Sequence, residues 1–175
     1  MRSSAALGAL ALALAPVAVA AGVPLLVVGG DLPRPGSLKL DELKALGAME
    51  RTWTSHGKAH KVVGVRLDRV LTARGFTPGT MGKNVPKAEK RAGFRKVVLA
   101  TASDGFQALL SCAEIAEQMG PTVALLVWEI DGAPLEADKG PLRLVVITDQ
   151  DSSRSIYAVQ RIEVLDVAAL AAQRR

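Results

Sequence analysis

Short apolar runs, separated by turns rich in glycine, proline and charged residues, dominate the hydrophobic pattern of this chain. Such runs predict β-strands, and their valine and isoleucine content supports that choice. We expect about seven strands, because runs of this kind recur along most of the chain. They fall within the ranges 23–30, 49–65, 97–111, 122–132, 142–148 and 155–165. Two of these ranges are predicted hairpins, which turn at 56–58 and at 103–105.

Other segments show the three- to four-residue apolar spacing of a short amphipathic helix. The first has acidic residues in its first turn and a glycine at its end, and both features favour a helix. Ser111 and Glu114 also form a capping-box pattern, which predicts a helix that begins at Cys112. The segments with helical spacing are 37–48, 65–76 and 166–175.

The order of these elements indicates the fold class. The helical segments do not alternate regularly with the strands, which argues against a doubly wound parallel sheet. The pattern instead predicts an α+β domain with mainly mixed or antiparallel β-structure and short flanking helices. The sequence has 175 residues and no internal repeat, so we expect a single domain over 21–175.

Residues 77–96 fit neither pattern. This segment carries six basic residues and one acidic residue, together with two prolines and three glycines. Prolines and glycines at this density argue against a regular element, so we predict a long basic surface loop. A loop of this length is uncommon and often functional, but a plain solvated connection is equally consistent with the pattern.

The first 20 residues have the pattern of a secretory signal peptide. Arg2 supplies the positive charge, Ala5–Ala15 the apolar core, and Ala18–Ala20 the small residues of a cleavage site. The apolar core is shorter than a typical membrane-spanning helix, although an uncleaved N-terminal anchor is an alternative. We therefore expect a periplasmic or secreted protein. The net charge of +5 then indicates solubility or attraction of anions rather than nucleic-acid binding.

Few side chains suggest chemistry. Cys112 is the only cysteine, so it is a buried thiol, a metal or redox thiol, or the partner of a cysteine in another protein. His56 and His60 are the only histidines, and both lie near a predicted hairpin turn. Two histidines are too few for a closed zinc site, so we interpret them as ordinary hairpin side chains. The sequence contains no serine-hydrolase elbow, phosphate-binding P-loop or zinc-peptidase motif.

Five segments, taken in order, resemble a known family. They are GGDLPRPGSLKLDELKAL, GVRLDRVL, TASDGFQALLSCAEI, LLVWEIDGAPLEADKGPLRLVVI and SRSIYAVQRIEV. Their order and spacing are similar to the oxidoreductase molybdopterin-binding domain of the sulfite oxidase and plant nitrate reductase superfamily, above all to its short, exported, single-domain bacterial members. The resemblance implies a sulfite-oxidase-type fold. It also implies a pterin cofactor whose molybdenum is bound by one cysteine thiolate and exchanges an oxygen atom with a small anion such as sulfite.

The chain departs from this family where the metal would bind. The resemblance places the metal-binding cysteine near residues 54–57, where this chain has Thr-Ser-His-Gly. The hydroxyl of Ser55 stays protonated at neutral pH and is not a soft ligand. A metal bound to His56 would form a different site, and Cys112 lies in the wrong part of the family pattern to replace the missing residue.

Two arginines remain where the resemblance implies contacts with the pterin, whereas Lys139 replaces a family histidine and Tyr157 a family lysine. Arginine suits a phosphate or a carboxylate, but Arg143 lies at the end of an apolar strand, where we favour a structural role. The resemblance assigns no catalytic or metal-binding residue. The candidate cofactor-binding residues that it implies are Ser55, His56, Arg143 and Arg154.

Three functions follow from these observations. The leading hypothesis is an exported, non-catalytic binding or accessory module that lacks the molybdenum-ligating cysteine and needs no cofactor. The second is a divergent molybdopterin-dependent oxidoreductase that holds the pterin through Arg154, His56 and the basic segment and acts on a small oxyanion. The third is a partner protein that forms a mixed disulfide through Cys112. The expected partners are an anionic small molecule or pterin, or a periplasmic or membrane protein, but not nucleic acid.

Overall fold

The computed structural model describes residues 25–78 and 86–173. Ten strands, four α-helices and one 3-10 helix lie within these ranges. The strands are β1 (Leu26–Gly30), β2 (Gly36–Leu38), β3 (Met49–Ser55), β4 (Lys58–Arg66), β5 (Lys96–Ala102), β6 (Gln107–Ser111), β7 (Ala124–Ile130), β8 (Ala133–Pro134), β9 (Arg143–Val146) and β10 (Val159–Asp166). The helices are α1 (Leu40–Ala45), α2 (Leu67–Ala73), α3 (Lys87–Phe94), η1 (Ser152–Arg154) and α4 (Val167–Ala172).

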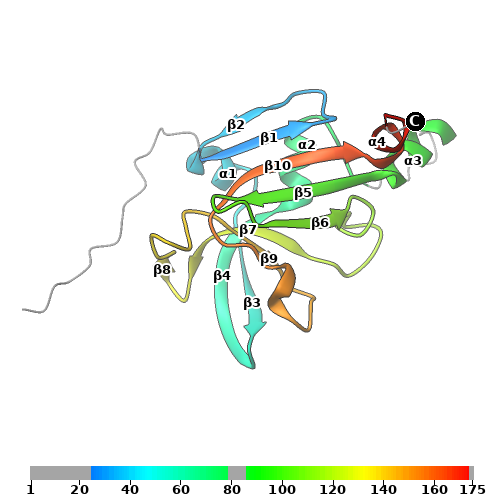
Figure 1. The fold of residues 1–175 in the computed structure, drawn as a ribbon. Helices are drawn as coiled ribbons and strands as arrows, with labels where there is room; N and C mark the ends of the chain where they lie inside the picture. Colours follow the sequence, from blue (N-terminus) through cyan, green and yellow to red (C-terminus); the bar gives the residue numbers. More distant parts are fainter. Residues whose placement is uncertain (1–24, 79–85, 174–175) are drawn as a thin grey trace, which may run out of the picture.

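The strands form two five-stranded sheets (Figure 1). In the first, with the order β2-β1-β10-β5-β6, β1 and β10 run parallel and the other neighbours run antiparallel. The second has the order β3-β4-β7-β8, with β9 also paired to β7, and its pairs are antiparallel. The predicted α+β class with mixed and antiparallel sheets is therefore confirmed, and both hairpins turn where the sequence predicts.

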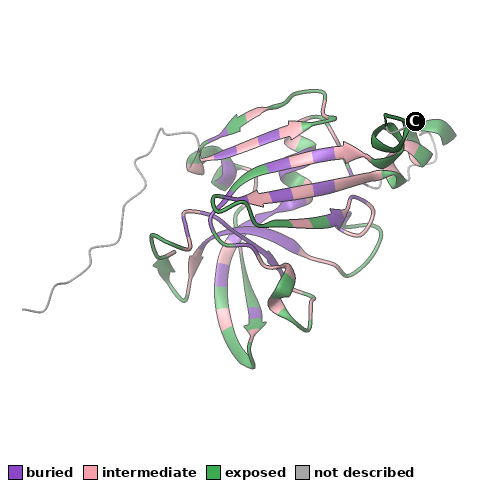
Figure 2. Ribbon diagram, in the orientation of Figure 1, coloured by how far each residue is buried: buried purple, intermediate pink, exposed green. Residues whose placement is uncertain are grey.

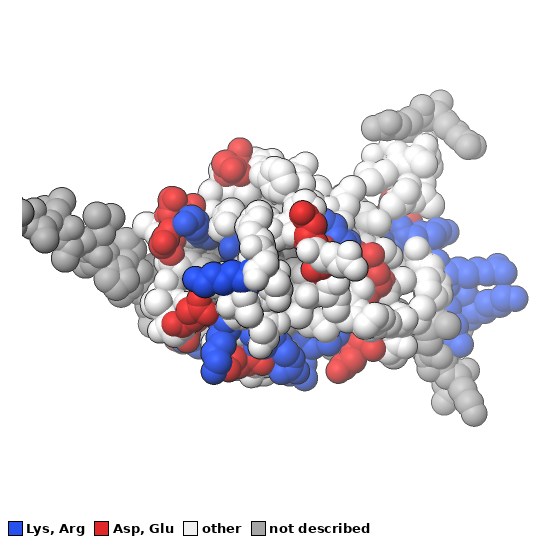
Figure 3. Space-filling model, turned by 90° about the horizontal axis from the view of Figure 1, so that it is seen from below, with Lys and Arg blue, Asp and Glu red and all other residues white. Residues whose placement is uncertain are grey.

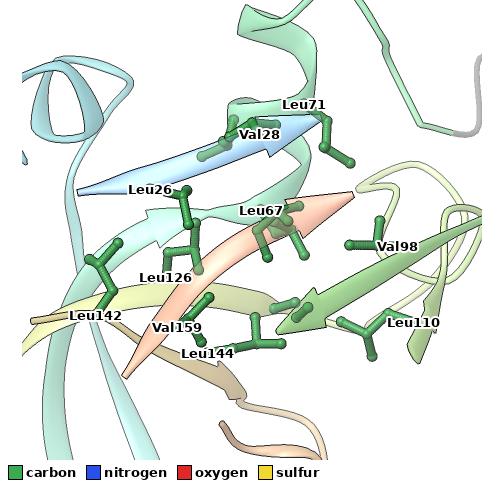
Figure 4. Packing of buried hydrophobic residues seen from close by; sticks show 14 of the residues in the cluster. Leu26, Val28, Leu67, Leu71, Val98, Leu110, Leu126, Leu142, Leu144 and Val159 are labelled. Carbon is green, nitrogen blue, oxygen red and sulfur yellow. The ribbon is translucent and has the colours of Figure 1, made fainter. Parts of the chain in front are cut away.

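The hydrophobic core has two parts, one on each face of β7. The larger cluster combines side chains from both sheets and from α2 (Figure 4). The smaller cluster contains Trp53 and Val62 from the hairpin together with Leu125 and Val127. Alternate residues of β7 face the two clusters, so 124–128 are buried throughout. This explains the continuous apolar run of β7, whereas β5 alternates between buried and partly exposed positions (Figure 2).

Gly64 lets the hairpin approach β7 closely. The pairing of β4 with β7 shifts register between Val63 and Gly64. A Cβ atom on Gly64 would lie 2.4 Å from the carbonyl oxygen of Leu126, which is too close for any side chain. The glycine in the segment GVRLDRVL therefore has a packing cause, and the chain passes directly from this contact into α2.

Part of the segment predicted to be a basic loop is helical. Helix α3 occupies Lys87–Phe94, so the prediction of a loop over 77–96 is wrong for these residues. Residues 79–85 lie outside the described ranges. The physical reason is that residues 87–92 are good helix formers, while Pro86 stands at the N-cap, where the lack of an N–H group does little harm. The basic side chains are therefore held on a helix.

The helix predicted to begin at Cys112 is not formed. Ser111 is the last residue of β6, and turns and bends occupy 112–119. The Ser111 hydroxyl oxygen accepts a hydrogen bond from the N–H of Ala113 at 3.2 Å. The N–H of Cys112 donates to the carbonyl of Lys96 in the neighbouring strand at 3.1 Å. These bonds satisfy the capping pattern with a turn attached to the sheet, so the prediction of a helix is wrong.

The predicted signal peptide, residues 1–20, lies outside the described ranges, and its cleavage stays a prediction. Within 25–78 and 86–173, no helix is long and apolar enough to cross a bilayer.

Candidate functional site

A pocket opens between the β3–β4 hairpin, the β7–β8 turn and Tyr157, and we call it the hairpin pocket. Its volume of about 600 Å³ is in the usual range of small-molecule sites. The hairpin register pairs Trp53 with His60 and Ser55 with Lys58, which places these four side chains on one face of the sheet. All four line the pocket, so strand alternation alone builds one of its walls.

Arg143 is the buried cation of the hairpin pocket. Its guanidinium carbon lies 4.5 Å from the ring centre of Trp53 and 3.9 Å from that of Tyr157. The residue is 7% exposed, and its Nε has no hydrogen-bond partner among the described residues. Burial lowers the pKa of Arg143, yet an arginine remains charged at neutral pH. A buried charge with an unused donor is costly unless a ligand satisfies it.

A histidine–aspartate pair joins the hairpin to the β7–β8 turn. The Nδ1 atom of His60 lies 2.7 Å from Oδ2 of Asp131, and the backbone N–H of Lys61 donates to Oδ1 at 2.9 Å. The hydrogen bond with His60, and to a smaller extent that with Lys61, lowers the pKa of Asp131. The acid lies 71 residues beyond His60 in the sequence, which is why no local pattern indicated it. His60 is therefore fixed in position by Asp131 and lines the hairpin pocket. The sequence pattern alone indicates only an ordinary hairpin side chain.

The charges around the hairpin pocket favour an anion. Lys139 pairs with Glu136, and this hydrogen bond raises the pKa of Lys139. Asp131 is in turn engaged by His60. Among the described residues, Lys58 and Arg143 are then the lining cations that form no salt bridge with a carboxylate. A small anion would complete this arrangement without displacing an existing ion pair.

Arg154, the fourth candidate from the sequence, lies in a different environment. Its Nε and Nη2 donate to the two carboxylate oxygens of Asp149 at 2.8 and 2.6 Å. Its Nη1 donates to Glu114 at 2.9 Å. The pKa of Arg154 is raised, mainly by the hydrogen bonds with Asp149. Arg154 is not among the lining residues of the hairpin pocket. The structure thus brings Ser55, His56 and Arg143 together and leaves Arg154 in a structural ion-pair network.

Cys112 lies in the larger core and not at the hairpin pocket. Its side chain is fully buried. Burial raises the pKa of the Cys112 thiol to about 12. Because Cys112 does not begin a helix, no helix N-terminus favours its thiolate, and the thiol is neutral at physiological pH.

The side chains of the hairpin pocket do not fit thiolate-bound molybdenum. Ser55 and His56 line the pocket in the segment where the resemblance expects the cysteine, but neither offers a thiolate. The only sulfur that could form one, that of Cys112, is buried elsewhere. In the part of the chain that the structure describes, no three histidine, cysteine or acidic side chains cluster so as to hold a metal ion. What remains at the pocket is a set of donors for an anion, among them the buried Arg143.

Comparison with known proteins gives the family. Residues 21–172 match the family described as the oxidoreductase molybdopterin binding domain. The chain belongs to this family. Among solved structures, it is similar to the sulfane dehydrogenase SoxCD from Paracoccus pantotrophus, with a TM-score of 0.62 and 14% sequence identity over 86% of this chain. The match covers 40% of that chain, so this protein spans less than half the length of its structural neighbour. No curated protein matches the sequence.

These findings confirm the predicted family and the predicted fold. At 14% identity, the likeness to SoxCD concerns the fold alone, so the chemistry of this chain has to be argued from its own side chains. Sequence reasoning missed Trp53 and Asp131 as parts of the site. Trp53 could have been found, because strand alternation places it on the face of Ser55. Asp131 could not, because only the tertiary fold brings it to His60.

Proposed function

We propose that this protein is an exported, non-catalytic binding module of the molybdopterin-binding-domain family that holds a small anionic ligand around Arg143. We also propose that it carries no thiolate-bound molybdenum. One observation supports this most directly. The hairpin pocket retains a buried arginine with an unpaired Nε, while the chain's only cysteine is buried in the larger core.

The environment of Arg143 defines the ligand that suits the pocket. The rings of Trp53 and Tyr157 lie close to the guanidinium, and its Nε has no partner among the described residues, so a ligand would bind at the hydrogen-bonding edge of the group. Carboxylate and phosphate oxygens match that edge, and hydrogen bonds to a charged donor are stronger than neutral ones. The aromatic side chains in the wall favour a ligand that carries a flat ring next to its anionic group. A metal-free pterin carboxylate meets these requirements and is a suitable probe.

The alternative of a divergent oxidoreductase loses its main residue. That hypothesis holds the pterin through Arg154, whose five-donor guanidinium is already engaged by Asp149 and Glu114. A ligand at Arg154 would have to displace two carboxylates and would gain little. The thiol-partner hypothesis is likewise weakened, because a buried neutral thiol does not attack a disulfide. The binding module is therefore the function that these side chains support best.

Titration of the purified exported protein with pterin-6-carboxylate and with inorganic phosphate tests the proposal, with tryptophan fluorescence as the signal. Trp53 is one of two tryptophans and contacts Arg143, so we expect binding to change its emission. Arg143→Gln should abolish this change, whereas Arg154→Gln, the matched control, should preserve it. The conservative variant Arg143→Lys keeps the charge and guards against loss of fold. Binding that survives Arg143→Gln in a folded protein would overturn the proposal.

A further inference from the structure

The helices α3 and α4 come together at one end of the molecule. The backbone N–H of Val167, the first residue of α4, donates to the carbonyl of Arg95 at 3.1 Å. The guanidinium of Arg95 pairs with Asp166 at 3.2 Å. These two contacts fix the end of α3 against the start of α4, at the right of the view in Figure 1. We call the exposed surface of these two helices the helical end.

Apolar side chains are exposed at the helical end. The six residues of α4 are Val-Ala-Ala-Leu-Ala-Ala, and none of them is buried. Val167 is 47% exposed and Leu170 is 44% exposed, and Phe94 at the end of α3 is also 44% exposed. A wholly apolar helix left on the surface is unusual for a soluble domain, where one face normally meets the core. Because the Val167 N–H bonds to the residue that follows Phe94, these exposed apolar side chains lie at the same end of the molecule, and we treat them as one candidate interaction surface.

Basic side chains flank these apolar ones. Helix α3 carries Lys87, Lys90 and Arg91, with Glu89 as its one acidic residue. Lysine and arginine side chains project from the right-hand end of the molecule in Figure 3, where α3 lies. No described residue forms an ion pair with any of these three cations. The positive charge of α3 is therefore available to a partner.

We infer that the helical end docks on an anionic lipid surface. Helices that present apolar side chains next to lysine or arginine bind at the boundary between headgroups and acyl chains, and Lys87, Arg91 and Phe94 follow the i, i+4, i+7 spacing of one face of α3. Here Phe94, Val167 and Leu170 would enter that boundary, while Lys87 and Arg91 would contact the lipid phosphates. Three large apolar side chains on two short helices offer too little area for a stable protein interface, which needs about 800 Å² on each partner. This inference rests on the helical end alone and is independent of the ligand in the hairpin pocket.

Co-sedimentation of the purified exported protein with lipid vesicles tests the inference. We expect binding to vesicles that contain phosphatidylglycerol, little binding to pure phosphatidylcholine, and weaker binding as salt is raised. Lys87→Gln/Arg91→Gln removes two charges and should weaken partitioning about 30-fold, since each basic residue near an anionic surface contributes about 5-fold. Phe94→Ser/Leu170→Ser should weaken it further. All variants have the same N-terminus, so the predicted signal peptide does not contribute to the differences in binding between them.

Lys44→Gln/Arg51→Gln is the matched control, because it removes the same charge from exposed positions on α1 and β3. We expect it to partition like the wild type. Absence of wild-type binding to the anionic vesicles would overturn the inference, as would an equal loss in the control variant. Analytical ultracentrifugation without lipid gives a separate check. A dimer that Phe94→Ser/Leu170→Ser dissolves would assign these side chains to a second copy of the chain and would also overturn it.

Discussion

The reactivity of Cys112 offers a quantitative test of its burial in the larger core. The thiol is fully buried, and burial raises its pKa from 9.0 to about 12. At about pH 8, a thiol with the ordinary pKa is roughly one tenth ionised, whereas Cys112 is roughly one ten-thousandth ionised. Ionisation alone therefore slows alkylation of Cys112 by about 1,000-fold relative to an exposed thiol, and steric exclusion of the reagent adds to this.

Iodoacetamide labelling followed by mass spectrometry measures the effect. The reference is an exposed thiol in the same protein, made by Ser103→Cys in a Cys112→Ser background, because Ser103 lies in the exposed β5–β6 turn. We expect Cys112 to react at least 1,000-fold more slowly than this reference in the native protein. In concentrated guanidinium chloride the two rates should become similar.

The same pKa shift predicts a dependence of stability on pH. Because the folded state raises the pKa of Cys112, the protonated thiol is favoured in the fold. The associated stability is fully present below the unfolded pKa near 9.0 and is lost as the pH rises toward 12.

In the labelling experiment, a rate for native Cys112 within about tenfold of the exposed reference would refute the reasoning and would reopen the thiol-partner hypothesis.

Three further predictions concern the hairpin and the ion pairs. Gly64→Ala places a Cβ 2.4 Å from the Leu126 carbonyl, so urea denaturation should show a loss of about 2 kcal/mol or more, and a loss below about 0.5 kcal/mol would contradict the packing argument. Asp131→Asn tests the lowered pKa of Asp131: the stability difference from the wild type should be present above the ordinary pKa of 3.8 and vanish as the pH falls through the lower folded value. A difference that thermal melts find unchanged at acid pH would be inconsistent with this. Arg154→Gln should cost only about 1 kcal/mol, because the side chain of Arg154 is 37% exposed, and a loss of ligand binding in this variant would count against its structural role.

The sequence predicted the longer strands and three of the four α-helices of the described residues, but it missed the short strands β2 and β8 and helix α3. Strand signals in this chain are local, since continuous apolar runs such as that of β7 and alternation such as that of β5 both appear in a short window. The segment 77–96 misled because its prolines and glycines lie largely outside the helix, before Lys87, while α3 itself is composed mostly of helix formers. Ser111 misled because a capping pattern is equally well satisfied by a turn when the neighbouring strand holds the backbone.

The candidate site was predictable only as far as the hairpin reaches. Ser55 and His56 were found from the family resemblance, and both line the hairpin pocket together with His60. The sequence favoured a structural role for Arg143 and a pterin contact for Arg154. The structure instead places Arg143 in the hairpin pocket beside two aromatic rings and Arg154 in an ion-pair network outside it. Long-range packing separates them, and no spacing within the chain encodes that difference.

Metal and pterin content of the protein, purified from a molybdenum-replete host, tests the central claim most directly. Elemental analysis should run beside pterin fluorescence after denaturation, on the wild type and on Ser55→Cys, which restores a thiol at the hairpin pocket. The account predicts molybdenum far below one atom per chain in the wild type, whether or not metal-free pterin is present. Molybdenum near one atom per chain in the wild type would contradict it. The hairpin pocket has no cysteine, so such a result would mean that the protein binds the metal without a thiolate at this pocket.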